Sequence, residues 1–256
     1  MIWSIETITV ARALTPGPEV FFQRDFESWV NIAVHMFVLR SDLGIVLVDS
    51  GLIADPEPLN AAMRRNKGQK AGFETIDSRA ETYLGTDVLA VMLTSFGPYA
   101  TGGLDRLRPD TPVYVSARGL ADLHRPEEPR FVHPLPGNIS ARLEQAIPVN
   151  GQDCLLPGLR FHEVGIHHPA SAAVEIDTAA GRVVIADPVF TAANLERQIA
   201  LGASEDASGW FAMVRTFAER NAAFLPVHEP SPAPVSVVCE PDGGWHVQNL
   251  RTMEAP

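Results

Sequence analysis

The chain has 256 residues, of which 46% are hydrophobic and 20% are charged. This composition is typical of a globular protein with a sizeable core, built as one large α/β domain or two small ones. The 20 basic and 31 acidic residues give a formal net charge of −11. Such a charge disfavours nucleic acid or an anionic membrane as the main partner. We see no signal peptide and no apolar run of about 18 residues, so we expect a cytoplasmic protein.

The two cysteines, Cys154 and Cys239, lie far apart and in no metal-like pairing. We expect both to be buried, reduced thiols.

Hydrophobic patterning in the first half predicts strands and helices in mixed order. In chain order we expect strands at 30–39 and 45–51 that form a hairpin, helices over 55–63 and 75–84, a strand at 88–94, a helix over 101–107, a strand at 112–115 and a helix over 117–123. The proline-rich segment 124–139 predicts an extended surface loop.

The second half turns to strands. We expect them at 159–164, 172–176, 183–187 and 223–227, with helices over 192–201 and 207–222 and a final hairpin formed by 234–239 and 245–250. Two strand-rich halves with helices among them favour mixed sheets covered by helices, in a single domain spanning residues 1–256.

Four polar positions end apolar strands or follow them closely: Asp49, the pair His167 and His168, Asp187, and His228. Side chains at strand ends converge at one edge of a sheet, where metal and acid–base sites are built. Asp49 and Asp187 are also natural turn formers, so each alone could simply cap a turn. The set of four together favours a site.

The order of these features resembles the metallo-β-lactamase-fold superfamily, and within it the homoserine-lactonase-like hydrolases. The matching motifs are Val48-Asp49-Ser50-Gly51, Gly165-Ile166-His167-His168-Pro169-Ala170-Ser171, Ile185-Ala186-Asp187 and Leu225-Pro226-Val227-His228. The resemblance implies a four-layer αββα sandwich with two mixed sheets flanked by helices, and a lactone- or ester-hydrolysing ancestry. It assigns metal-ligand positions to His167, Asp187 and His228, with Asp187 as the bridge between two metals.

The chain departs from this family in its first motif. The family pattern Thr-His-x-His-x-Asp-His, followed by a residue and Gly-Gly, stands here as Thr94-Ser95-Phe96-Gly97-Pro98-Tyr99-Ala100-Thr101-Gly102-Gly103. Ser95 and Gly97 replace two histidines, while Tyr99 and Ala100 replace the aspartate and the last histidine. A catalytic zinc needs about three protein ligands, so we expect no dinuclear zinc site and at most one divalent metal, zinc or iron.

Three interpretations follow, and they belong to different classes. In the first, the chain is a non-catalytic or repurposed homologue that binds a small molecule, alone, as a homodimer or paired with an active paralogue. In the second, His167, Asp187 and His228 hold one metal, because two histidines and a carboxylate form a known mononuclear ligand set. In the third, Ser95 is a metal-free nucleophile with His167 or His228 as its base and Asp187 orienting that base.

Tyr99 and His168 have further candidate roles. Tyr99 could act as an acid, and Tyr99 and His168 could contact the substrate. Ser95 could equally be a small residue that fills the space of a lost histidine. Because Ser95, Gly97 and Ala100 are smaller than the residues they replace, we expect an intact, enlarged cavity with the Tyr99 phenol at its wall.

Overall fold

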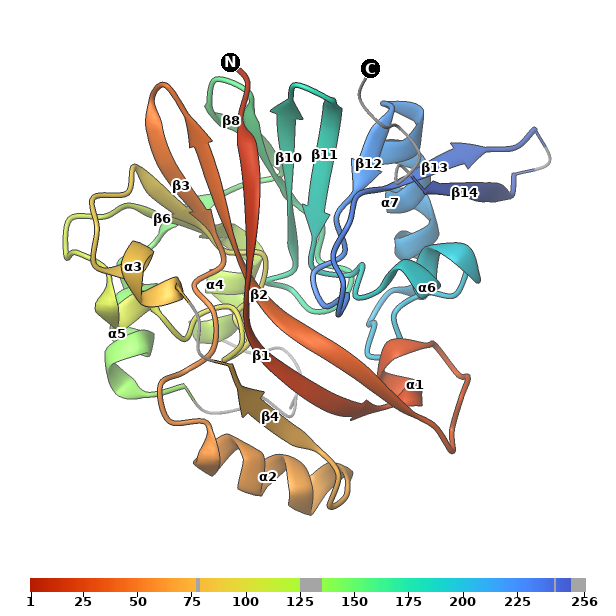
Figure 1. The fold of residues 1–256 in the computed structure, drawn as a ribbon, viewed down its shortest axis with the longest axis horizontal. Helices are drawn as coiled ribbons and strands as arrows, with labels where there is room; N and C mark the ends of the chain where they lie inside the picture. Colours follow the sequence, from red (N-terminus) through yellow and green to blue (C-terminus); the bar gives the residue numbers. More distant parts are fainter. Residues whose placement is uncertain (77–78, 125–134, 242, 250–256) are drawn as a thin grey trace.

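The computed structural model describes residues 1–76, 79–124, 135–241 and 243–249. Two seven-stranded sheets pack face to face, and helices cover their outer faces (Figure 1). This arrangement confirms the expected αββα architecture.

The first sheet has the strand order β4-β1-β2-β3-β5-β6-β7. Its strands are β1 (Ser4–Pro16), β2 (Trp29–Ser41), β3 (Gly44–Val48), β4 (Gly72–Thr75), β5 (Ala90–Met92), β6 (Val113–Ser116) and β7 (Ile147–Val149). β1, β2 and β3 form an antiparallel meander, whereas β3, β5, β6 and β7 run parallel. The carboxyl ends of these parallel strands therefore meet at one edge of the sheet, where the Asp49 and Thr94 loops leave it.

The second sheet has the order β14-β13-β12-β11-β10-β9-β8. Its strands are β8 (Gln152–Leu156), β9 (Leu159–Glu163), β10 (Ala172–Thr178), β11 (Gly181–Ala186), β12 (Ala222–Phe224), β13 (Val235–Cys239) and β14 (Trp245–Asn249). β11 and β12 are parallel, and the other neighbours are antiparallel. The turn that carries His167 and His168 joins β9 to β10, and Asp187 directly follows β11.

The helices are short. They are α1 (Gly17–Val20), α2 (Glu57–Lys67), α3 (Ala80–Leu84), the 3₁₀ helix η1 (Leu104–Arg106), α4 (Ala117–His124), α5 (Gly137–Glu144), α6 (Ala192–Glu196) and α7 (Ala207–Glu219). α6 begins at a capping box in which Thr191 and Asn194 satisfy each other's backbone donors. α7 begins at Asp206, whose side chain accepts a hydrogen bond from the Gly209 N–H at 2.7 Å. Within the described ranges, no helix is long and apolar enough to cross a membrane.

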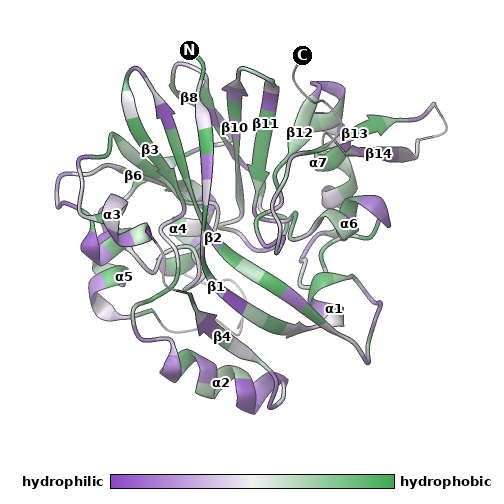
Figure 2. Ribbon diagram, viewed as in Figure 1, coloured by the Kyte–Doolittle hydropathy of each residue, from purple (hydrophilic) through white to green (hydrophobic). Residues whose placement is uncertain are grey.

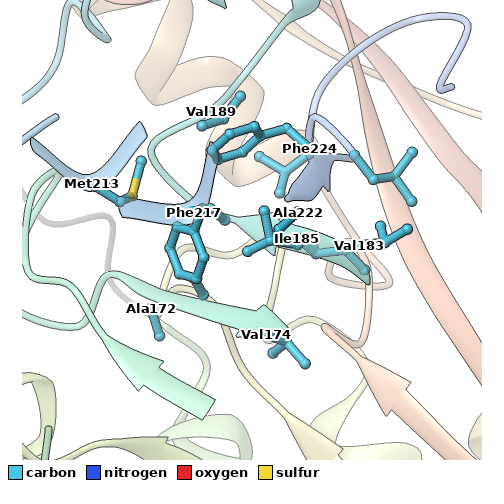
Figure 3. Close-up of a cluster of buried hydrophobic side chains, with 14 of the residues drawn as sticks. Ala172, Val174, Val183, Ile185, Val189, Met213, Phe217, Ala222 and Phe224 are labelled. Carbon is cyan, nitrogen blue, oxygen red and sulfur yellow. The ribbon is translucent and has the colours of Figure 1, made fainter. Parts of the chain in front are cut away.

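Apolar side chains fill the space between the sheets and the space under the helices. One buried cluster joins β2, β3 and β5 to the second sheet and α7, and another joins the outer face of the first sheet to α2, α3 and α5. Hydrophobic residues accordingly concentrate along the strands (Figure 2). Figure 3 shows Met213 and Phe217 of α7 packed over strands β10 to β12. Phe217 meets the fully buried Phe224 edge-on, with ring centroids 6.1 Å apart.

The structure corrects several sequence predictions. β1 was not expected. The predicted helix over 75–84 is shorter in the structure: Thr75 ends β4, helix α3 begins only at Ala80, and 77–78 lie outside the described residues. The predicted loop over 124–139 lies partly outside the described residues, and its end opens α5. Both cysteines are free but exposed, not buried, because each lies near the rim of the second sheet.

Candidate functional site

Asp49 anchors the loop that follows β5. Its carboxylate accepts hydrogen bonds from the Thr94 N–H at 2.8 Å and the Thr94 hydroxyl at 2.7 Å. Asp49 has a φ of +58°, in the left-handed region that aspartate tolerates better than most residues. Burial raises the pKa of Asp49 to about 7, although the two Thr94 hydrogen bonds act in the opposite direction.

Two glycines let this loop pack against the loop after β3. A Cβ at Gly102 would lie 2.0 Å from backbone atoms of Leu52 and Ile53, and one at Gly103 would lie 2.4 Å from the Ser50 carbonyl oxygen. No larger residue fits at either position without moving the backbone. The Gly-Gly pair therefore fixes where the preceding residues, Ser95 to Ala100, stand.

The turn between β9 and β10 is held from both sides. The two ends of the turn are joined by the Ser171 carbonyl, which accepts hydrogen bonds from the N–H groups of Val164 and Gly165 at 3.0 and 2.9 Å. Gly165 has a φ of +63°, which glycine adopts readily. The Ala172 N–H donates to the Thr94 carbonyl at 2.8 Å. This last bond joins the second sheet to the first and brings the two histidines to the Ser95 loop.

Asp187 lies at the centre of a polar cluster. Its Oδ2 accepts from the Ser171 hydroxyl at 2.6 Å, lies 3.0 Å from Nδ1 of His167 and lies 3.8 Å from Nε2 of His168. The carboxyl is almost fully buried, and burial alone would raise its pKa. The two imidazoles and the Ser171 hydroxyl outweigh burial and bring the pKa below its usual range. Asp187 is thus a buried carboxylate anion that needs donors or a cation beside it.

Ser95 bonds to His168. Its hydroxyl oxygen lies 3.0 Å from Nε2 of His168 and 3.4 Å from the Tyr99 hydroxyl, and it accepts from the Gly97 N–H at 3.0 Å. Ser95 has no exposed surface. A hydroxyl that is enclosed and already bonded in this way is poorly placed to attack a substrate, which favours the space-filling role.

His228 follows β12 and is oriented by the first sheet. Its Nδ1 lies 2.7 Å from the Ala33 carbonyl oxygen, which can only accept, so Nδ1 carries the proton. Burial lowers the pKa of His228 to about 4, against the effect of that hydrogen bond. The neutral ring contacts Phe190 and Tyr99 edge-on, with centroids 4.4 and 5.1 Å away.

Tyr99 occupies the space beside Gly97. A Cβ at Gly97 would lie 2.4 Å from Cε1 and Cζ of the Tyr99 ring and 2.9 Å from its hydroxyl. The same ring packs against His228. Burial strongly raises the pKa of Tyr99, with the Asp187 charge acting in the same direction. The phenol therefore stays protonated at neutral pH.

The structure brings the predicted site residues together with changed partners. The imidazole that contacts the Ser95 hydroxyl belongs to His168, whereas the third interpretation expected His167 or His228. The carboxylate of Asp187 likewise gathers His167 and His168, whereas His228 contacts aromatic rings. The turn geometry explains this difference, since adjacent residues 167 and 168 both face Asp187.

Sequence reasoning missed two members of the site. Ser171 makes the shortest hydrogen bond to Asp187, and the Phe190 ring lies against both His167 and His228. Ser171 stands in a matched motif and could have been found there. Phe190 had no comparable signal.

Three donors at this cluster are close enough to hold one divalent metal. Ligand atoms of His167, His168 and Asp187 lie within 4.8 Å of one another. Two donors on one tetrahedral zinc lie roughly 3.4 Å apart, given metal–ligand bonds of about 2.1 Å. The separations of 3.0 and 3.8 Å from Asp187 to the two imidazoles lie on either side of that value.

Cavities are present elsewhere in the molecule. The described part of the chain has one cavity of about 410 Å³ beside β9 and α7, and another of about 570 Å³ at residues 25–28 in the β1–β2 connection. Ser95, Tyr99 and His228 line neither of them. The Tyr99 ring fills the space beside Gly97, and the enlarged cavity expected at this cluster stays a prediction.

No family model and no curated protein matches the sequence. Solved structures do match the fold. A mutant of AiiA from B. thuringiensis, with N-decanoyl-L-homoserine bound at its active site, matches 90% of this chain and 95% of its own, with a TM-score of 0.72 and 16% identity.

Two other solved structures agree. A probable metal-dependent hydrolase from Staphylococcus aureus matches 98% of each chain, with a TM-score of 0.73 and 14% identity. AidC, a dizinc quorum-quenching lactonase in complex with a hexanoyl-homoserine product, matches 98% of this chain and 96% of its own, with a TM-score of 0.68 and 12% identity. At these identities the comparison establishes the fold.

Proposed function

We propose that this chain, which has the metallo-β-lactamase fold, binds a small molecule at a hydrolase-type site that works without a dinuclear metal centre. The fold and the lactonase-like scaffold are shared with the solved hydrolases described above. What distinguishes this chain is the content of the loop after β5.

The observation that carries the proposal is the position of Tyr99. In the related motif, residue 97 would be a histidine of the first metal and residue 228 a histidine of the second. Here the Tyr99 ring lies against both positions, 2.4 Å from a Cβ at Gly97 and 5.1 Å from the His228 ring centroid. A ring in that place leaves no room for a ligand at 97, and the phenol and serine that replace the lost donors bind zinc weakly at neutral pH.

Part of the site is accessible to solvent, because His167, His168 and Tyr99 are half-buried rather than buried. The side chains of His167 and His168 are 13% and 23% exposed, whereas that of Asp187 is 1% exposed. A ligand arriving from solvent would therefore contact the imidazole edges and the Tyr99 ring, with Asp187 holding the imidazoles from behind. Small acyl compounds of the kind bound by AiiA and AidC are the first class to test.

The test combines metal content with ligand binding. Protein purified without added metal is measured by mass spectrometry, and titration calorimetry follows binding of N-hexanoyl-L-homoserine lactone and its ring-opened acid. We expect less than about 0.1 metal per chain, binding of at least one compound without turnover, and loss of binding in His168→Ala. His246→Ala, in the exposed final hairpin, is the matched control. About two metals per chain, or lactone turnover, would contradict the proposal.

A second candidate is a mononuclear metal-dependent hydrolase. It is favoured by the separations among His167, His168 and Asp187, which suit a single tetrahedral ion. These residues would hold the metal, in place of the set with His228 that the sequence suggested. When bound, such a metal would polarise a substrate carbonyl and activate water. Ser171 would keep Asp187 oriented, whereas Nε2 of His168 would give up its contact with the Ser95 hydroxyl to bind the metal, because one ring nitrogen cannot serve both partners.

The two candidates differ in metal stoichiometry. The second predicts about one zinc per chain after dialysis against zinc, lost in Asp187→Asn and retained in His228→Gln. Retention of zinc in Asp187→Asn would exclude this donor set. Homodimer formation and pairing with an active paralogue both stay predictions, and sedimentation analysis of the purified chain addresses the first.

A further inference from the structure

The cavity of about 410 Å³ lies between β9 and α7; its lining includes Ile166, the residue before His167, but neither histidine of the pair. Its volume is in the usual range for small-molecule sites. Its apolar wall includes Val164 and Ile166 on one side and Met213 and Phe217 of α7 on the other. Figure 3 shows these last two side chains on the face of α7 that covers the second sheet.

The cavity runs along α7 with a different charge at each end. Gly209 in the first turn of α7 and Arg220 directly after its last residue both line it. Eleven residues of α-helix separate them, which corresponds to roughly 16 Å. Asp206 lies at the same end as Gly209. A ligand in the cavity would therefore meet a carboxylate at one end and a guanidinium at the other.

The guanidinium at Arg220 belongs to a cluster with excess positive charge. Three arginines share two carboxylates: Arg160 makes a bidentate pair with Asp177 at 3.1 and 3.0 Å, and Arg182 contacts Glu175 at 3.1 Å and Asp177 at 3.4 Å. Within the described part of the chain, Arg220 pairs with Glu175 alone, at the longer distance of 3.6 Å. It is the least engaged cation of the three.

The acidic groups at the other end are already hydrogen-bonded. Asp206 caps α7 through the Gly209 N–H, and Glu163 accepts from the Ser116 hydroxyl at 2.7 Å and the Arg118 N–H at 2.8 Å. Their charges repel an anion from that end. They therefore set the direction of a bound anion rather than prevent its binding.

We propose that this cavity is a second ligand site, which takes a small monocarboxylate with an apolar tail. The carboxylate pairs with the Arg220 guanidinium, and the tail lies between Phe217 and Met213 on one side and Val164 and Ile166 on the other. Arginine suits this role because its planar fork can bond both carboxylate oxygens. The site is separate from the histidine pair and does not depend on the function proposed above.

Titration calorimetry with sodium hexanoate tests the proposal, with uncharged hexanamide as the matched probe. We expect hexanoate to bind more tightly than hexanamide by at least about tenfold, because a charge-assisted hydrogen bond is worth that much in affinity. Arg220→Gln should reduce hexanoate affinity by about tenfold or more and leave hexanamide unchanged. Arg215→Gln removes the same charge from the same helix outside the cavity, and should leave both affinities unchanged.

Three results would overturn the proposal. They are the absence of hexanoate binding up to about 10 mM, equal affinities for hexanoate and hexanamide, and equal weakening by Arg220→Gln and Arg215→Gln. Asp187→Asn, at the histidine pair, should leave hexanoate binding intact. Loss of hexanoate binding in Asp187→Asn would also overturn the proposal, because it would show that hexanoate binds at the histidine pair and not in this cavity.

Discussion

The contact between Gly97 and Tyr99 can be tested by a double-mutant cycle. Gly97→Ala places a methyl group 2.4 Å from two ring carbons of Tyr99, well inside normal van der Waals contact. Gly97 does not have a positive φ, so alanine suits its backbone and only the ring opposes it. Overpacking of this kind costs about 1 to 3 kcal/mol. We therefore expect Gly97→Ala to lower the free energy of unfolding by that amount.

The second arm of the cycle removes the ring. In a Tyr99→Ala background the clash is absent, so Gly97→Ala should be neutral or stabilise by up to about 1 kcal/mol through the unfolded chain. The coupling energy is then about 1 to 4 kcal/mol, measured by urea denaturation followed by tryptophan fluorescence. Gly137→Ala is the control, since nothing lies within 4 Å of its Cβ position. Additive effects of the Gly97 and Tyr99 changes would refute the packing account.

Three other predictions follow from buried groups near the site. Because burial raises the pKa of Asp49 to about 7, the wild-type protein should lose stability as pH rises from about 4 to 7, by up to about 1.4 kcal/mol per pH unit. Asp49→Asn removes this ionisation, so its free energy of unfolding, measured by urea denaturation, should increase relative to that of wild type as pH rises. A difference that stays constant across this range would contradict the prediction. His228, whose pKa is lowered to about 4, acts with the opposite sign, so stability is lost as pH falls from about 6.5 to 4 and this loss should be absent in His228→Gln. Ser95→Ala leaves the Gly97 N–H without its acceptor and should cost about 1 to 2 kcal/mol in thermal or urea unfolding, whereas an unchanged midpoint would show that water replaces the hydroxyl.

The sequence predicted the frame of the site because the residues that build it follow local rules. Asp49 and Asp187 end apolar strands, and Gly102 and Gly103 mark a loop that packs closely on another backbone. Hydrophobic periodicity and turn-forming residues can be recognised in the sequence without knowledge of tertiary contacts. The hairpin of β2 and β3 was predicted for the same reason.

The contents of the site could not be predicted in the same way. Which imidazole bonds to Ser95 depends on how the β9–β10 turn folds over Asp187, and adjacent residues His167 and His168 carry no local signal that separates them. The placement of the Tyr99 ring depends on the empty space at Gly97 and on the His228 ring, both set by packing between sheets. β1 was missed because it alternates polar and apolar residues only in part and gains its stability from pairing with β2.

The bond between the Ala172 N–H and the Thr94 carbonyl has a mechanical consequence. His167, His168, Asp187 and His228 all lie in loops that follow strands of the second sheet, whereas the replaced positions 95 to 100 all lie in a loop of the first sheet. A metal on the remaining donors would therefore have ligands on one sheet alone. Hydrogen bonds that join the halves here include Ala172 to Thr94, His168 to Ser95, and Nδ1 of His228 to the Ala33 carbonyl at 2.7 Å. Cohesion between the two sheets at this edge thus comes from ordinary hydrogen bonds, and a chelator should leave it intact.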